Sequence, residues 1–156
     1  MATLSDRQSE NIRFWFEVFN GLDLPCRVRI DKGLAEPLVW LPAPGTSHGG
    51  YGLPFAAYYR SPDDRKIGCY VRPREGDDVA RRIFGALGEP PVMKSWDEGG
   101  ERRSLGYECE IGVMPGHGED ETPEFREAVR WMRYHLDKLV RTLYPRISEM
   151  LSQDET

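Results

Sequence analysis

Long apolar runs are missing from this 156-residue sequence. None approaches the roughly 18 to 20 residues that a membrane-spanning helix needs, so we expect no membrane segment. The first residues, Met1 to Asp6, also lack the charged and then apolar layout of a signal peptide. These two absences predict a cytoplasmic protein.

Cysteine is also scarce. The three cysteines, Cys26, Cys69 and Cys109, are far apart and form no CxxC or Cys/His pattern. An odd number of widely spaced cysteines does not suit a disulfide framework or a structural zinc site. We therefore expect reduced thiols in the core.

The familiar catalytic motifs are absent as well. The sequence contains neither a G-x-S-x-G nucleophile elbow nor the spacing of a phosphate-binding P-loop. His48 lies in the Gly-rich stretch Gly45–Gly50, and His117 stands between two glycines. Two isolated loop histidines do not make a triad, so we expect no catalytic residues and no cofactor. The sequence leaves the role of Gly45–Gly50 and of both histidines open.

The composition is that of a folded, mildly acidic protein. Hydrophobic residues make up 39% of the chain and aromatic residues 11%, which is enough for a real core. The formal charge of -5 argues against general binding to nucleic acid or anionic membranes, although a local basic face can override it.

The order of apolar patterns predicts an α+β fold. Hairpin-length connections between the strands favour an antiparallel sheet of about five or six strands, with an N-terminal helix and a long C-terminal helix packed on it. No linker is evident, so residues 1–156 are predicted to form one domain. The expected elements are a helix over 5–20, strands over 27–30, 38–41, 51–59 and 67–71, a helix from Asp77 or Asp78 to Gly88, strands over 92–96 and 105–113, and a helix over 122–151.

The last helix organises this arrangement. Thr122 suits its N-cap and Pro123 its first position. Pro145 should kink or interrupt its last turns. A continuous apolar stripe is formed by Phe125, Val129, Met132, Leu136, Leu139, Leu143 and Ile147.

The first helix is apolar on two faces. Ile12, Trp15, Phe16 and Phe19 have the spacing of a buried face, while Phe14 and Val18 point elsewhere. Either the helix lies inside the core or its second face contacts a partner. The second reading leaves a homodimer open.

The last helix also carries an arginine stripe, formed by Arg126, Arg130, Arg133 and Arg141. Six cationic and three anionic side chains between Thr122 and Ile147 give this region a formal charge of +3. Spaced arginines suit phosphate or carboxylate recognition. Alternatively, the stripe is the solvated face of an amphipathic helix.

Several carboxylates form a weaker candidate for a functional site, a metal site. Glu108 and Glu110 share one face of a strand, and Asp63 and Asp64 are predicted in a turn. Paired carboxylates can bind Mg²⁺. A metal-dependent nuclease would typically add a lysine two residues after the second carboxylate, and none is present here. The polar side of a sheet explains the same residues.

Three segments resemble a bacterial family known as domain of unknown function 4268. They are Arg13–Phe16, Ile67–Val71, and Trp131–Ile147 with its Leu139, Pro145 and Arg146. Members of that family often follow nuclease-like domains, near restriction and DNA-defence functions. The resemblance implies an accessory module and supplies no catalytic residues.

Three functional hypotheses follow. The first is a non-catalytic binding domain whose arginine stripe contacts nucleic acid or a protein partner, beside nucleic-acid-processing or DNA-defence enzymes. The second is a small metal-dependent hydrolase or nuclease that uses Glu108, Glu110 and Asp63 or Asp64. The third is an acidic antitoxin- or immunity-type protein, which the charge of -5 fits.

Overall fold

The computed structural model describes eight stretches of the chain. They are residues 6–24, 38–41, 55–59, 66–73, 78–87, 93–98, 101–110 and 123–154. The predicted strand over 27–30, the predicted turns at 61–64 and 99–100, and the Gly-rich loops at 45–50 and 114–121 lie outside these stretches.

The described part of the chain is an antiparallel sheet covered on one face by helices, which confirms the α+β class. Its strands are β1 (Leu38–Leu41), β2 (Phe55–Tyr59), β3 (Lys66–Val71), β4 (Lys94–Glu98) and β5 (Glu101–Glu110). They form one five-stranded sheet in the order β1-β2-β3-β5-β4. The predicted N-terminal and C-terminal helices are confirmed as α1 (Asp6–Phe19) and α3 (Pro123–Asp154), and the short helix as α2 (Asp78–Leu87).

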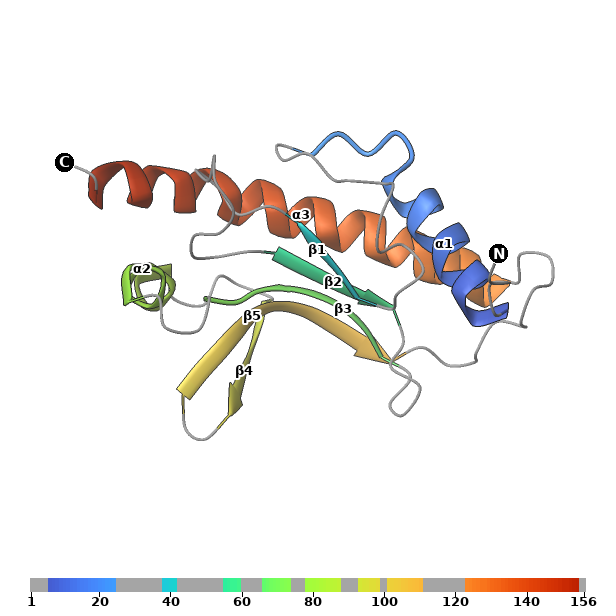
Figure 1. Cartoon of the computed structure of the whole chain (residues 1–156), viewed down its shortest axis with the longest axis horizontal. Coiled ribbons are helices and arrows are strands. Elements are labelled where there is room, and N and C mark those ends of the chain that lie inside the picture. Colours follow the sequence, from blue (N-terminus) through green and yellow to red (C-terminus); the bar gives the residue numbers. More distant parts are fainter. Residues whose placement is uncertain are drawn as a thin grey trace, which may run out of the picture.

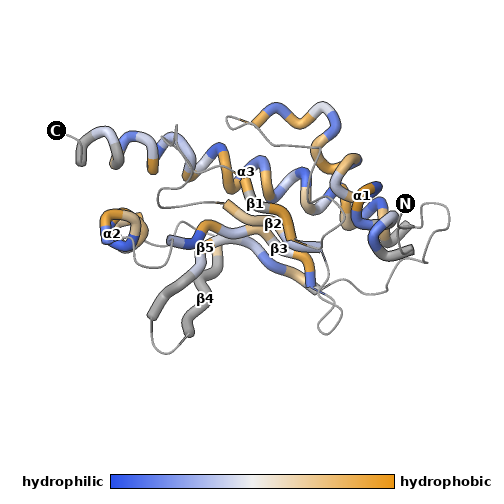
Figure 2. Tube along the Cα trace, viewed as in Figure 1, coloured by the Kyte–Doolittle hydropathy of each residue, from blue (hydrophilic) through white to orange (hydrophobic). Residues whose placement is uncertain are grey.

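α3 is the longest element of the fold. Its 32 residues span about 48 Å at 1.5 Å per residue, and Figure 1 shows it running along the molecule over one face of the sheet. α1 lies against its N-terminal half, and α2 lies toward the other end of the sheet. Hydrophobic and hydrophilic positions alternate along α3 at short intervals (Figure 2), as expected for a helix with one buried face.

The predicted apolar stripe of α3 is confirmed. Val129 is partly buried against the core, and the other six members are at most 2% exposed. The stripe packs on the sheet face formed by alternate residues of the strands, which include Phe55, Ile67, Cys69 and Leu105. This packing explains the two apolar patterns in the sequence. Apolar residues recur at every second position in the strands and at every third or fourth position in α3, because both sets face the same core.

Two details of the helices differ from the sequence predictions. Pro145 was expected to kink or interrupt the last turns of α3, and the interruption does not occur, because the helix continues through Pro145 to Asp154. Pro145 is solvent-exposed, while Leu143 and Ile147 beside it are fully buried, so core packing holds the turns that the proline weakens. In α1, Phe16 was expected inside but is 54% exposed, whereas Phe14 and Val18 are fully buried. The buried face of α1 is therefore rotated, because the ring of Phe14 stacks on Tyr59.

No helix in the described stretches has the length and apolarity required to cross a membrane.

Candidate functional site

α1 ends beside α3, and this junction brings most of the predicted arginine stripe together. Gly21 adopts a φ of 73°, a left-handed conformation that favours glycine after the last helical turn. Asn20 N donates to Phe16 O at 2.9 Å, and Leu22 N donates to Phe19 O at 3.2 Å. The chain thus turns sharply and leaves the last carbonyl groups of α1 facing α3.

Arg133 of α3 occupies this position. Its Nη1 donates to the carbonyl oxygens of Glu17 and Val18 at 3.0 Å and of Asn20 at 2.7 Å. The carbonyl end of a helix carries partial negative charge, so a guanidinium there is favourable. Arg133 is therefore a cap for α1, supplied by a residue more than 110 positions away in the sequence.

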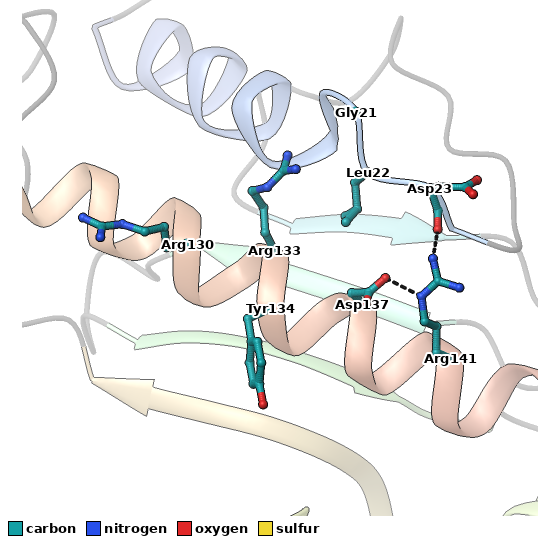
Figure 3. Close-up of a pocket in the computed structure, with 8 residues that line it drawn as sticks. All are labelled: Gly21, Leu22, Asp23, Arg130, Arg133, Tyr134, Asp137 and Arg141. Carbon is teal, nitrogen blue, oxygen red and sulfur yellow. Dashed lines mark hydrogen bonds and ion pairs between the residues drawn. The ribbon is translucent and has the colours of Figure 1, made fainter.

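Arg141 holds the next part of the chain. Its Nε donates to Asp137 Oδ1 at 2.7 Å, one helical turn earlier, and its Nη2 donates to the carbonyl oxygen of Asp23. Figure 3 shows both contacts. Two of the four predicted arginines thus connect α3 to the end of α1 and to the residues that follow it.

Two hollows lie along this junction and share Arg130. The larger has a volume of about 490 Å³ and the smaller of about 450 Å³. We call the two together the α1–α3 groove. The larger is lined by Gly21, Leu22, Asp23, Arg130, Arg133, Tyr134, Asp137 and Arg141, and the smaller by Glu17, Phe125, Arg126, Val129 and Arg130.

Arg130 differs from Arg126, Arg133 and Arg141 in its contacts with the described residues. It is exposed, and its side chain makes no hydrogen bond or ion pair in the described structure. Figure 3 shows it pointing away from the Asp137–Arg141 pair. Arg126, one turn earlier, is also exposed but has an interaction partner within the chain. Arg130 is therefore the arginine best placed to contact a second molecule.

The groove is close to neutral. Four arginines (Arg126, Arg130, Arg133, Arg141) and three carboxylates (Glu17, Asp23, Asp137) line it, so its formal charge is +1. Its walls also carry apolar surface from Leu22, Phe125 and Val129, and Tyr134 is 62% exposed. Such a mixture can recognise one or two anionic groups next to an apolar contact.

Tyr134 also belongs to an aromatic cluster around His135. The ring of His135 stacks on Trp131 at 4.1 Å and lies 5.0 Å from the rings of Tyr107 and Tyr134. His135 Nδ1 lies 2.9 Å from the carbonyl oxygen of Trp131, where Nδ1–H donates. Burial lowers the pKa of His135 below 6.5, and the positive charge of Lys138 lowers it further against the effect of that hydrogen bond.

Of the carboxylates predicted for a metal site, only the side chain of Glu108 is among the described residues. Glu108 accepts a hydrogen bond at Oε2 from the Tyr58 hydroxyl, and its Oε1 lies 3.6 Å from Lys66 Nζ. Its carboxylate is thus occupied by a phenol and an ammonium group. Asp63, Asp64 and the side chain of Glu110 fall outside the description, and the described residues contain no cluster of three metal-ligating side chains.

Sequence patterns alone did not single out Tyr134 or the segment Gly21–Asp23 as parts of this site. Tyr134 follows Arg130 by four positions, so helical spacing could have placed it beside the arginine stripe. The contribution of Gly21–Asp23 could not be found in this way, because it depends on how α1 lies against α3.

Comparison with family models, with curated proteins and with solved structures finds no match to this chain. The likeness to the domain of unknown function 4268 family therefore stays a prediction.

Proposed function

We propose that this chain is a non-catalytic interaction domain that binds a protein partner in the α1–α3 groove. One observation carries the proposal: Arg130 is exposed between two hollows, while Arg133 and Arg141 beside it are fixed by hydrogen bonds to α1 and the following residues. Side chains that are already ordered lose little entropy when a ligand binds next to them, which favours affinity.

The surface chemistry favours a protein over a nucleic acid. Arginine and tyrosine are enriched at the centres of protein–protein interfaces, and both line the groove. Nucleic-acid binding is driven mainly by neutralising several phosphates. Two of the four arginines already satisfy oxygens of this chain, and three carboxylates lie among them. A binding role beside nucleic-acid-processing enzymes rests on the family resemblance alone.

Site-specific photocrosslinking in the cell of origin tests the proposal. The photoreactive residue p-benzoylphenylalanine replaces Tyr134 in one variant and Phe16 in a second. Both positions are exposed aromatics, at 62% and 54%, but only Tyr134 lines the groove. The proposal predicts one discrete protein adduct at position 134 and none of that mass at position 16. The same adduct from both positions, or an adduct to nucleic acid at position 134, would contradict it.

A further inference from the structure

The charges of the groove also indicate what kind of protein segment would fit. We infer that the occupant is an acidic segment whose carboxylate pairs with Arg130 while a neighbouring apolar side chain contacts Tyr134. This inference rests on the proposed function and narrows the partner to one chemistry.

The geometry around Arg130 supports recognition of a single carboxylate. Arg130 belongs to both hollows, so a group bound to it has space on either side. A planar guanidinium can pair with a carboxylate through two parallel hydrogen bonds. Arg126 lies one turn away on the same face, about 6 Å along the helix. It already has an interaction partner within the chain, so Arg130 is the anchor of this site.

Arg133 offers a second hydrogen-bond donor to the bound segment. Because its side chain is already fixed, binding to it costs little further conformational entropy. Its Nη1 makes all three bonds to the end of α1, and among the described residues its Nε and Nη2 have no acceptor. The guanidinium lines the larger hollow. The Nε and Nη2 edge of this guanidinium is therefore held in a fixed position beside Arg130.

The negative groups of the groove limit how much anionic charge it accepts. Asp137 and Asp23 lie beside Arg141, on the side of the larger hollow away from Arg130 (Figure 3), and Glu17 lines the smaller one. The formal charge of the groove is +1. One bound carboxylate would neutralise this charge, whereas a run of phosphates would leave a net negative charge. The same acids repel a polyanion, so a short acidic stretch that contains apolar residues suits the groove better than a nucleic-acid backbone.

The apolar contact comes from Tyr134. Its ring packs at 5.0 Å against His135, and the ammonium group of Lys138 lies 5.7 Å from the ring centre. The phenol ring therefore contacts His135 and Lys138, while 62% of the residue remains exposed to solvent. A leucine or aromatic side chain next to the bound carboxylate would cover this exposed surface.

A titration of the purified full chain tests the inference with defined probes. The probes are a capped ten-residue peptide that carries two glutamates and two leucines among serine and glycine residues, the same peptide with lysine in place of glutamate, and a ten-nucleotide single-stranded DNA. The readout is the NMR signal of each arginine Nε–Hε group, at about 50 and about 200 mM salt. We expect the acidic peptide to shift the Arg130 signal to saturation with a Kd below about 1 mM, and the other two probes to leave it in place.

Two variants localise the effect. Arg130→Gln should weaken binding of the acidic peptide by about fivefold or more. Arg146→Gln should leave the Kd within about twofold, because Arg146 is exposed on the same helix but lines neither hollow. No saturable shift, tighter binding of the DNA, or equal effects of the two variants would overturn the inference. A specific crosslink at position 134 together with no peptide binding would retain the interaction domain and reject only its acidic partner.

Discussion

Arg133 Nη1 donates to the carbonyl oxygen of Asn20 at 2.7 Å, across 113 positions of sequence. This bond and those to Glu17 and Val18 make one arginine of α3 the cap of α1. The same arginine lines the larger hollow of the α1–α3 groove. The residue that fixes the helix junction is therefore also part of the surface that we assign to partner binding.

Replacing Arg133 should destabilise the fold, whereas replacing Arg130 should not. Arg133→Met removes the guanidinium whose Nη1 donates its two hydrogens to three carbonyl oxygens at the end of α1, so one hydrogen is shared. The loss of this charged donor should cost about 1–2 kcal/mol of unfolding free energy. For a chain of this size the melting temperature then falls by roughly 2–8 °C. Arg130→Met removes no bond within the described structure and should stay within about 0.5 kcal/mol of the wild type. Thermal unfolding of both variants checks this pair, and equal destabilisation would show that Arg133 is not a cap.

A second prediction concerns the close approach of β3 and β5. A Cβ atom at Gly106 would collide with the backbone of Cys69 and Tyr70, which cannot move without breaking the pairing of the two strands. Gly106→Ala should therefore cost about 2–4 kcal/mol of unfolding free energy.

Gly85 in α2 is the matched control, since a Cβ atom there meets no heavy atom within 4 Å. Alanine is the better helix former, so Gly85→Ala should leave the stability unchanged or raise it by up to about 1 kcal/mol. Chemical denaturation of both variants measures the difference. A neutral Gly106→Ala would mean that β3 and β5 are not packed this closely.

The sequence predicted the helices and strands well where one face of an element is buried. The apolar stripe of α3 from Phe125 to Ile147 and the apolar alternation in β3 both face a single core. The spacing of their apolar residues is therefore recognisable in the sequence. Phe16 was misplaced because α1 has two apolar faces, and only its packing against Tyr59 and Phe125 decides which face is buried.

The candidate site was only half predictable. The spacing of Arg126, Arg130, Arg133 and Arg141 places them on one side of a helix. It does not distinguish an arginine that caps α1 from one without a partner among the described residues. That distinction depends on contacts between residues more than 100 positions apart. Helical periodicity carries no information about such contacts.

A third prediction is that His135 makes the stability depend on pH. Burial is the main cause of its lowered pKa, so the native state binds a proton less readily than the unfolded state. The stabilising effect of neutral His135 is complete above a pH of about 6.5 and decreases as the pH falls below that value.

Between pH values of about 7.5 and 5.5, the unfolding free energy of the wild type should therefore decrease more steeply than that of His135→Phe. The phenylalanine keeps a ring against Trp131 and does not titrate, while all other histidines remain. Urea titrations at several pH values measure both slopes. Parallel slopes would assign the pH dependence to other groups.

A fourth prediction concerns thiol reactivity. Burial raises the pKa of the Cys69 thiol, which is fully enclosed between the sheet and α3, so little thiolate forms there. Cys109 on β5 is only partly buried. In the native protein at a pH of about 8, iodoacetamide should label Cys109 well before Cys69, and both should react at similar rates in denaturant. Mass spectrometry of the labelled peptides resolves the two sites, and early labelling of Cys69 would contradict its burial.

The measurement that most directly tests the proposed role of Arg130 is the crosslinked fraction at position 134 when Arg130 is reversed in charge. Arg130→Glu should reduce the partner adduct by about tenfold or more, equivalent to about 1.4 kcal/mol of binding free energy, without lowering the melting temperature. Arg146→Glu, which reverses an exposed charge outside the groove, should leave the adduct unchanged. An adduct that survives Arg130→Glu, or that both variants reduce equally, would contradict the assignment of the α1–α3 groove as the partner site.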